Sequence, residues 1–94
     1  MFERDDNKAA ENERKHNVTF DEAESAFDDE NSVEFFDAAH STEEKRFQRL
    51  AISTKRLLFI IYTIRDEAGE EVIRLISARK ATARETEIYN EYND

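Results

Sequence analysis

The run LLFIIYTI at residues 57–64 constrains the fold more than any other part of the chain. Its residues are apolar at successive rather than alternate positions and are rich in β-branched and aromatic types, which is typical of a strand covered on both faces. Segments of similar composition, at residues 46–53 and 71–78, flank the predicted strand 57–65, and only a few polar residues separate the three. The pattern predicts antiparallel hairpins with the central run in the middle of a sheet.

Two helices are predicted before these strands. Residues 6–16 combine an acidic start with good helix formers and a basic end, and Asn17 suits the left-handed conformation of a C-terminal cap. Thr19 and Glu22 have the spacing of a capping box, so we expect a short second helix to begin there. Its apolar stripe would consist of Phe20, Ala23 and Phe27.

A strand over residues 33–36 and a final helix complete the prediction. Thr82 and Glu85 repeat the capping-box spacing, and the helix that follows has one apolar side. That side is formed by Ile88, Tyr89 and Tyr92. The expected fold is therefore α+β, in the order α-α-β-β-β-β-α, with a twisted antiparallel sheet packed by helices in one domain of residues 1–94.

Charge is unevenly distributed along the 94 residues, whose formal net charge is −9. Residues 1–44 hold 4 basic and 15 acidic side chains, residues 45–84 hold 10 and 4, and residues 85–94 hold none and 4. This asymmetry suggests one surface able to meet a polyanion and another able to meet a basic protein. The alternative is a chance segregation of solvated charges.

Composition also excludes several classes of protein. The chain has no cysteine, and hence neither a disulfide framework nor a thiolate metal site. Its N-terminus lacks the apolar stretch of a signal peptide, and its longest apolar run is too short to cross a bilayer. We therefore expect a cytoplasmic protein without a membrane partner, and no cofactor.

The strand pattern brings arginines together if both hairpins use two-residue turns, at Thr54–Lys55 and at Ala68–Gly69. Counting from these turns, Arg46 lies opposite Thr63, and Thr63 lies opposite Arg74, all on one face. Two further polar side chains share that face: Gln48 and Arg65. The apolar side chains expected there are Leu50, Ile52, Leu57, Phe59, Ile61, Val72 and Ile76.

Clustered arginines can bind phosphate oxygens in bidentate fashion and stabilise charge that develops during phosphoryl transfer. The alternative is that they are ordinary exposed strand ends, with side chains that snorkel over their neighbours. A slip of one residue in the pairing would move every side chain to the other face, so the pattern leaves both interpretations open.

The segments KAAENERKHNVTFDEA, HSTEEKRF, RLLFIIYT and IRLISARKATARE resemble, in that order, the pattern of BrnT-type toxins. The resemblance implies a RelE-like fold and a metal-independent ribonuclease that inhibits growth. It also implies neutralisation by a BrnA-type antitoxin with a ribbon-helix-helix DNA-binding region. Promoter DNA would be bound only by the toxin and antitoxin together.

Seven positions that match the family carry side chains suited to RNA cleavage: Arg46, Arg74, Arg79, Lys80, Arg84, Glu85 and Tyr89. By this resemblance the first three would bind the scissile phosphate, while Lys80 or Arg84 would contact flanking phosphates. Arg65, which the predicted register places on the face of Arg46 and Arg74, would also bind RNA. Tyr89 or Glu85 would transfer protons during attack by the ribose 2′-hydroxyl. Glu85 is equally well explained as a helix-capping side chain, and Tyr89 as a core aromatic residue.

Other candidates are weaker. His16 could act as a general base, but a helix end favours a basic side chain there in any case. Asp37, His40 and Glu43 lie in a polar loop without a known metal-ligand spacing, so we do not expect a metal site. A second functional hypothesis is a catalytically weak or inactive interaction module that binds the antitoxin and acts in promoter autoregulation. Direct DNA binding is disfavoured because no basic recognition helix is evident.

Overall fold

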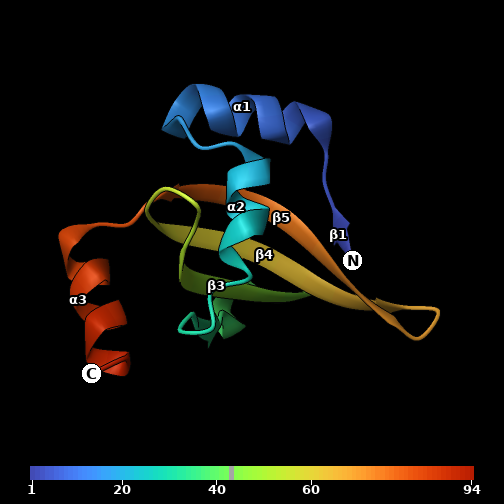
Figure 1. Cartoon of the computed structure of the whole chain (residues 1–94). Coiled ribbons are helices and arrows are strands. Elements are labelled where there is room, and N and C mark those ends of the chain that lie inside the picture. The colour runs from blue at the N-terminus through green and yellow to red at the C-terminus, as the bar shows by residue number, and fades with distance from the viewer. Residues whose placement is uncertain (43) are drawn as a thin grey trace.

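The computed structural model of the protein describes residues 1–42 and 44–94. The elements of this part of the chain are β1 (Phe2–Glu3), α1 (Asp6–His16), α2 (Phe20–Ala26), β2 (Val33–Phe36), the 3₁₀ helix η1 (Ala38–His40), β3 (Lys45–Ile52), β4 (Leu57–Glu67), β5 (Glu70–Lys80) and α3 (Ala83–Tyr92). Figure 1 shows α1 and α2 stacked over one side of the sheet, while α3 stands apart at one end of the strands. None of the described helices is long and apolar enough to cross a membrane.

The strands form a mixed sheet in the order β1-β5-β4-β3-β2. β4 is the middle strand, as predicted for the run LLFIIYTI. The expectation of a wholly antiparallel sheet is wrong, because β1 pairs with β5 in parallel, Phe2 beside Ile73 and Glu3 beside Arg74. The predicted order also lacked this strand and η1, since segments of two or three residues are too short to show a periodic pattern.

Both hairpins have the predicted register. Arg46 pairs with Thr63, and Thr63 pairs with Arg74. The pairing of β4 with β5 then shifts by one residue between Ile61 and Tyr62, where a β-bulge inserts an extra residue into β5. The sequence pattern did not reveal this bulge.

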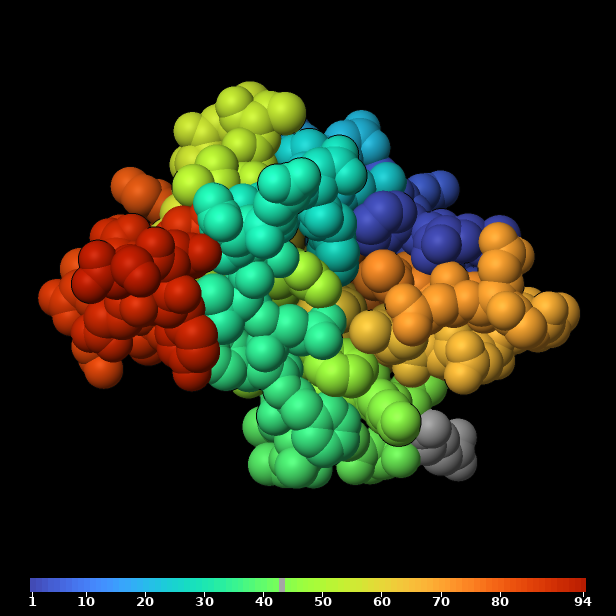
Figure 2. Space-filling view, turned by 60° about the horizontal axis from the view of Figure 1, so that its bottom comes forward, coloured from blue at the N-terminus to red at the C-terminus, as the bar shows by residue number. Residues whose placement is uncertain are grey.

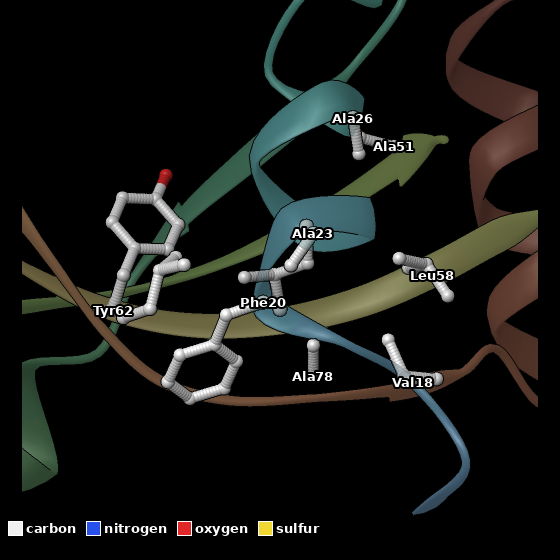
Figure 3. Packing of buried hydrophobic residues seen from close by; sticks show 10 residues of the cluster. Val18, Phe20, Ala23, Ala26, Ala51, Leu58, Tyr62 and Ala78 are labelled. Carbon is white, nitrogen blue, oxygen red and sulfur yellow. The ribbon is translucent and has the colours of Figure 1, made fainter. Parts of the chain in front are cut away.

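The main core lies between α2 and the sheet, where Figure 3 shows its side chains. Leu58, Ile60 and Tyr62 of β4 point toward the helices and are fully buried. α2 contributes Phe20, Ala23 and Ala26, whose small or planar side chains let the helix approach the sheet closely. The successive apolar residues of β4 therefore divide between this core and the opposite face, which we call the open face and which carries Arg46, Thr63 and Arg74.

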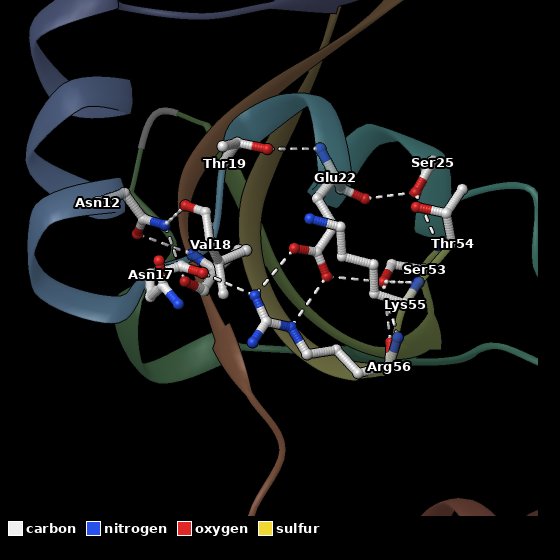
Figure 4. Close-up of polar contacts among 11 residues, drawn as sticks. Asn12, Asn17, Val18, Thr19, Glu22, Ser25, Ser53, Thr54, Lys55 and Arg56 are labelled. Carbon is white, nitrogen blue, oxygen red and sulfur yellow. Dashed lines mark hydrogen bonds and ion pairs between the residues drawn. The ribbon is translucent and has the colours of Figure 1, made fainter.

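The helix ends follow the predictions except at one side chain. Asn17 has a φ of 55° and caps α1, and the Thr19 hydroxyl accepts a hydrogen bond from the Glu22 amide at 3.0 Å. The Glu22 carboxylate does not complete a capping box with Thr19. It instead accepts hydrogen bonds from Arg56 at 3.0 and 3.1 Å and from Ser53 at 2.7 Å, which ties α2 to the β3–β4 turn (Figure 4).

The edge of β5 is partly covered by Asn12, a buried residue of α1. Its side-chain amide donates to Ala78 O at 2.8 Å and accepts from Ala78 N at 3.0 Å, as a neighbouring strand would. The same amide donates to Val18 O at 2.9 Å, so one side chain joins α1, the loop before α2 and the sheet (Figure 4).

α3 covers one end of the open face. Its capping box is complete: Thr82 accepts from the Glu85 amide at 3.1 Å, and Glu85 accepts from the Thr82 amide at 2.9 Å. Tyr92 packs edge-on against Phe35 of β2, with ring centroids 5.8 Å apart. In the space-filling view of Figure 2, α3 (red) lies beside the segment that includes β2 (teal), and the β4–β5 hairpin (orange) projects at the opposite end.

Candidate functional site

Five side chains form a row across the open face, one from each strand or from its extension. Pairing of the strands aligns Arg46 with Thr63, Thr63 with Arg74, and Arg74 with Glu3. Asp37 completes the row because its backbone amide donates to Arg46 O at 2.8 Å, which extends the β2–β3 ladder by one residue. We call this set the arginine row. Its charges run negative, positive, neutral, positive and negative from Asp37 to Glu3.

Carboxylates flank the basic side chains in and beside this row. Arg65 donates to both Glu3 oxygens at 2.7 and 3.2 Å and lies 3.7 Å from Glu44. Arg74 lies 3.8 Å from Glu3 and 3.9 Å from Glu44. The hydrogen bonds from Arg65 hold the pKa of Glu3 below its usual value, so this carboxyl is ionised at neutral pH. The two arginines therefore share two anionic partners within the chain.

Arg46 lies between the segment after β2 and the rest of the row. Its side chain is 29% exposed, and its Nε lies 3.8 Å from Asp37 Oδ2. Among the described residues this buried Nε has no hydrogen-bond partner. The backbone amide of Arg46 donates to Ser41 Oγ at 2.9 Å. The segment after β2 thus fixes the backbone of Arg46 and places a carboxylate near its guanidinium.

The β-bulge decides where Arg79 points. With the register of the hairpin turn continued unchanged, Arg79 would lie opposite the buried Leu58, whereas the shifted ladder pairs it with Phe59. Arg79 consequently lies on the open face, with its guanidinium carbon 4.3 Å from the centroid of the Phe59 ring. Because Phe59 and Thr63 are four residues apart on β4, Arg79 and the arginine row are separated by roughly 13 Å along the strands.

Arg79 is paired with Glu85 in a bidentate contact, with both N–O distances at 2.9 Å. The hydrogen bonds from Arg79 hold the pKa of Glu85 below its usual value, and Glu85 also caps α3. Lys80 is exposed at the end of β5. Arg84 is exposed on α3 and pairs with Glu87 at 3.1 Å. These predicted residues therefore form a second group, separate from the arginine row.

Tyr89 lies in neither group. It is 7% exposed, and its hydroxyl donates to Asp29 Oδ2 at 2.7 Å. Burial and this hydrogen bond raise the pKa of Tyr89 to about 12. Its contacts attach α3 to the loop after α2.

The remaining candidates are the histidines and the proposed metal cluster. His16 is exposed in the last turn of α1, where the sequence predicted it. Asp37 and His40 contact each other through a carboxylate oxygen and Nδ1, 3.0 Å apart. Glu43, the third residue considered for a metal, lies outside the described residues.

Sequence reasoning missed the acidic partners of the arginines and the bulge that orients Arg79. Glu44 lies two residues before Arg46 and directly precedes β3. Continuing the predicted register by two residues would therefore have placed it on the same face as Arg46. Glu3 could not be placed in this way, because its place depends on a two-residue strand that pairs with β5 more than 60 positions away.

The sequence was also compared with known families. The family model of BrnT, the ribonuclease toxin of a type II toxin-antitoxin system, matches residues 5–85, a span that includes Arg46, Arg74 and Arg79. The chain therefore belongs to the BrnT family of type II ribonuclease toxins. No individually curated protein resembles it closely enough to be called a relative.

Proposed function

We propose that this chain is a RelE-like, metal-independent endoribonuclease that cleaves RNA in the cytoplasm and inhibits growth. The observation that carries the proposal is the alignment of Arg46, Thr63 and Arg74 on one face of the sheet. Adjacent strands lie about 4.8 Å apart, so the two arginine backbones are roughly 10 Å apart. Two extended guanidiniums can converge on one phosphate at that separation, above the small side chain of Thr63.

In the proposed mechanism, Arg46 and Arg74 bind the scissile phosphate and stabilise the charge that develops when the ribose 2′-hydroxyl attacks it. Arg65, beside the row, contacts a flanking phosphate. Arg79 with Lys80 and Arg84 would meet phosphates of nucleotides further along the strand, since roughly 13 Å separates Arg79 from the row. An RNA phosphate would compete with Glu3 and Glu44 for the arginines, which makes binding sensitive to salt.

Glu85 and Tyr89 have structural partners that favour other roles. Glu85 is engaged by Arg79 and by the Thr82 amide, and Tyr89 is buried against Asp29. We therefore assign Glu85 to capping α3 and Tyr89 to the contact of α3 with the loop after α2. The proton from the 2′-hydroxyl needs another acceptor.

The proposed partner is a BrnA-like antitoxin with a ribbon-helix-helix region, and the complex of the two would bind promoter DNA through the antitoxin. Residues 1–44, with 15 acidic and 4 basic side chains, offer charge complementarity to a basic segment of such a partner.

The test is incubation of the purified protein with RNA in EDTA, together with expression in cells that lack the antitoxin. Cleavage and growth arrest are expected. Absence of both would overturn the proposal.

One observation favours the second candidate function, an interaction module that binds the antitoxin and acts in promoter autoregulation. Arg65 and Arg74 already have carboxylate partners in the free chain, which lowers the positive charge available to RNA. Two results together would establish this alternative. The chain would form a tight complex with the antitoxin, and substitutions at Arg46, Arg74 and Arg79 would leave all of its activities unchanged.

A further inference from the structure

Asp37 and His40 form a hydrogen-bonded pair at the end of the arginine row. Asp37 follows β2 and starts η1, where its Oδ1 accepts from the His40 amide at 3.3 Å. The short helix turns the His40 ring back onto the carboxylate, so that Nδ1 lies 3.1 and 3.0 Å from Oδ1 and Oδ2. The sequence spacing of three residues and the N-cap geometry together fix this contact.

The two side chains differ sharply in exposure. Asp37 is 9% exposed, whereas the His40 side chain is 65% exposed. Figure 2 shows the segment that contains η1 (green) projecting at the surface below the teal segment. A largely buried acceptor therefore holds the Nδ1 edge of an imidazole that is mostly exposed to solvent.

The carboxylate is suited to orient the ring. Burial acts to raise the pKa of Asp37, but hydrogen bonds from His40 and Gln48 outweigh it and hold the pKa below its usual value. Asp37 is therefore an anion at neutral pH, and an anion accepts hydrogen bonds only. The contact selects the tautomer with a proton on Nδ1, which leaves the Nε2 lone pair free to accept a proton.

The pair is next to the groups assigned to the scissile phosphate. Asp37 Oδ2 lies 3.8 Å from Arg46 Nε and 3.3 Å from Gln48 Nε2, besides its contact with His40. His40 Nδ1 and Arg46 Nε are thus both within 4 Å of one oxygen atom. This proximity is short enough for Arg46 and His40 to contact neighbouring groups of one nucleotide.

We propose that His40, oriented by Asp37, is the general base of the ribonuclease reaction. The inference rests on the proposed function. Nε2 of His40 takes the proton from the ribose 2′-hydroxyl while the 2′-oxygen forms a bond to phosphorus. The bond from phosphorus to the 5′-oxygen breaks, and this oxygen takes a proton from solvent. The products are a 2′,3′-cyclic phosphate and a 5′-hydroxyl, and the imidazolium returns its proton to solvent.

The experiment measures cleavage by the full chain at saturating RNA in EDTA, and affinity for the same oligonucleotide with a 2′-deoxy position at the scissile site. His40→Gln and His40→Ala are expected to lower the cleavage rate by roughly a hundredfold or more, as loss of general base catalysis does. Affinity for the uncleavable strand should stay within about twofold, because no phosphate contact is removed. The matched control is His16→Gln, which changes the other histidine and should cleave at the wild-type rate.

Two further measurements separate a chemical role from a structural one. Free imidazole should restore part of the activity of His40→Ala, and Asp37→Asn should lower the rate while keeping the N-cap of η1. If the wild-type protein cleaves RNA and both His40 variants cleave at rates within threefold of it, the role of His40 is overturned but the proposed function is not. If the wild-type protein itself does not cleave RNA, the proposed function fails and this inference fails with it.

Discussion

Glu3 of β1 accepts two hydrogen bonds from Arg65 of β4. The two side chains reach each other across β5, which lies between their strands. The same carboxylate lies 3.8 Å from Arg74, so a residue near the N-terminus faces two of the basic side chains that the proposal assigns to RNA. In the proposed function, phosphate oxygens would take the positions of the Glu3 oxygens. β1 would then compete with RNA for these arginines.

The first prediction follows from this competition. Glu3→Gln should raise the affinity for an uncleavable single-stranded RNA by roughly three- to tenfold at low ionic strength, because one competing negative charge is removed. Glu70→Gln, at the exposed β4–β5 turn, is the matched control for net charge. Fluorescence anisotropy at several salt concentrations measures both. Equal gains for the two variants would show that overall charge, not the contact with Arg65, sets the affinity.

The second prediction concerns the arginine row itself. Arg46→Ala and Arg74→Ala should each lower the cleavage rate by roughly a hundredfold, since each removes a donor to the developing phosphate charge. Lys45→Ala, an exposed neighbour on the opposite face, should change the rate by less than about twofold. Rates are compared after circular dichroism has established that all three variants are folded. If the two arginine variants cleave RNA at the wild-type rate, the catalytic site lies elsewhere.

The third prediction concerns the ion pair that joins α2 to the β3–β4 turn. The Glu22 side chain is 4% exposed, so Arg56→Met, which leaves its carboxylate without the guanidinium, should lower the free energy of unfolding by about 2–4 kcal/mol. Arg84→Met breaks an exposed pair on α3 and should cost less than about 0.5 kcal/mol. Urea unfolding measures both. A similar loss in the two variants would contradict a special role for the buried pair.

The same pair predicts how stability depends on acidity. Burial acts to raise the pKa of Glu22, but Arg56 and Ser53 outweigh it and hold the pKa below its usual value in the folded state. Its contribution is complete above the ordinary glutamate pKa of about 4.3 and is lost as the pH falls through the lower folded-state pKa. In Glu22→Gln this part of the acid dependence should disappear. An unchanged slope between wild type and variant would rule the pair out as its source.

The fifth prediction tests the role given to Tyr89. Tyr89→Phe should lower the free energy of unfolding by about 1 kcal/mol through loss of the hydrogen bond to Asp29, without changing the cleavage rate. Because the folded-state pKa is raised to about 12, the wild-type protein should lose stability as the pH rises from about 10 toward 12. The variant should lose less. A large drop in cleavage by a folded Tyr89→Phe protein would restore Tyr89 as a catalytic candidate.

The hairpin registers could be predicted because each turn contains two residues, and the position of Arg46 opposite Thr63 follows by counting. The same counting fails beyond Ile61, since an inserted residue changes the parity of every later side chain and leaves no mark in the composition of β5. Arg79 would have been assigned to the buried face by the regular ladder. Its orientation is a property of the folded strand pair.

Glu22 shows a second limit of local sequence rules. The Thr19–Glu22 spacing satisfied the capping-box pattern, yet only the Thr19 half forms. The Glu22 carboxylate instead pairs with Arg56, which is 34 residues away in the sequence. A hydrogen bond from a charged guanidinium is stronger than one from a neutral backbone amide. The identical pattern at Thr82 and Glu85 is fully realised, because Glu85 can reach the Thr82 amide and Arg79 at once.

The amide of Asn12 gives the molecule protection against self-association. An uncovered strand edge offers its amides and carbonyls to any chain of similar length, and growth from such an edge leads to fibrils. Ala78 has both of its outward groups occupied by a side chain of the same molecule. A single carboxamide on a helix thus occupies the outward backbone groups of Ala78, which disfavours the addition of another chain at this position of β5.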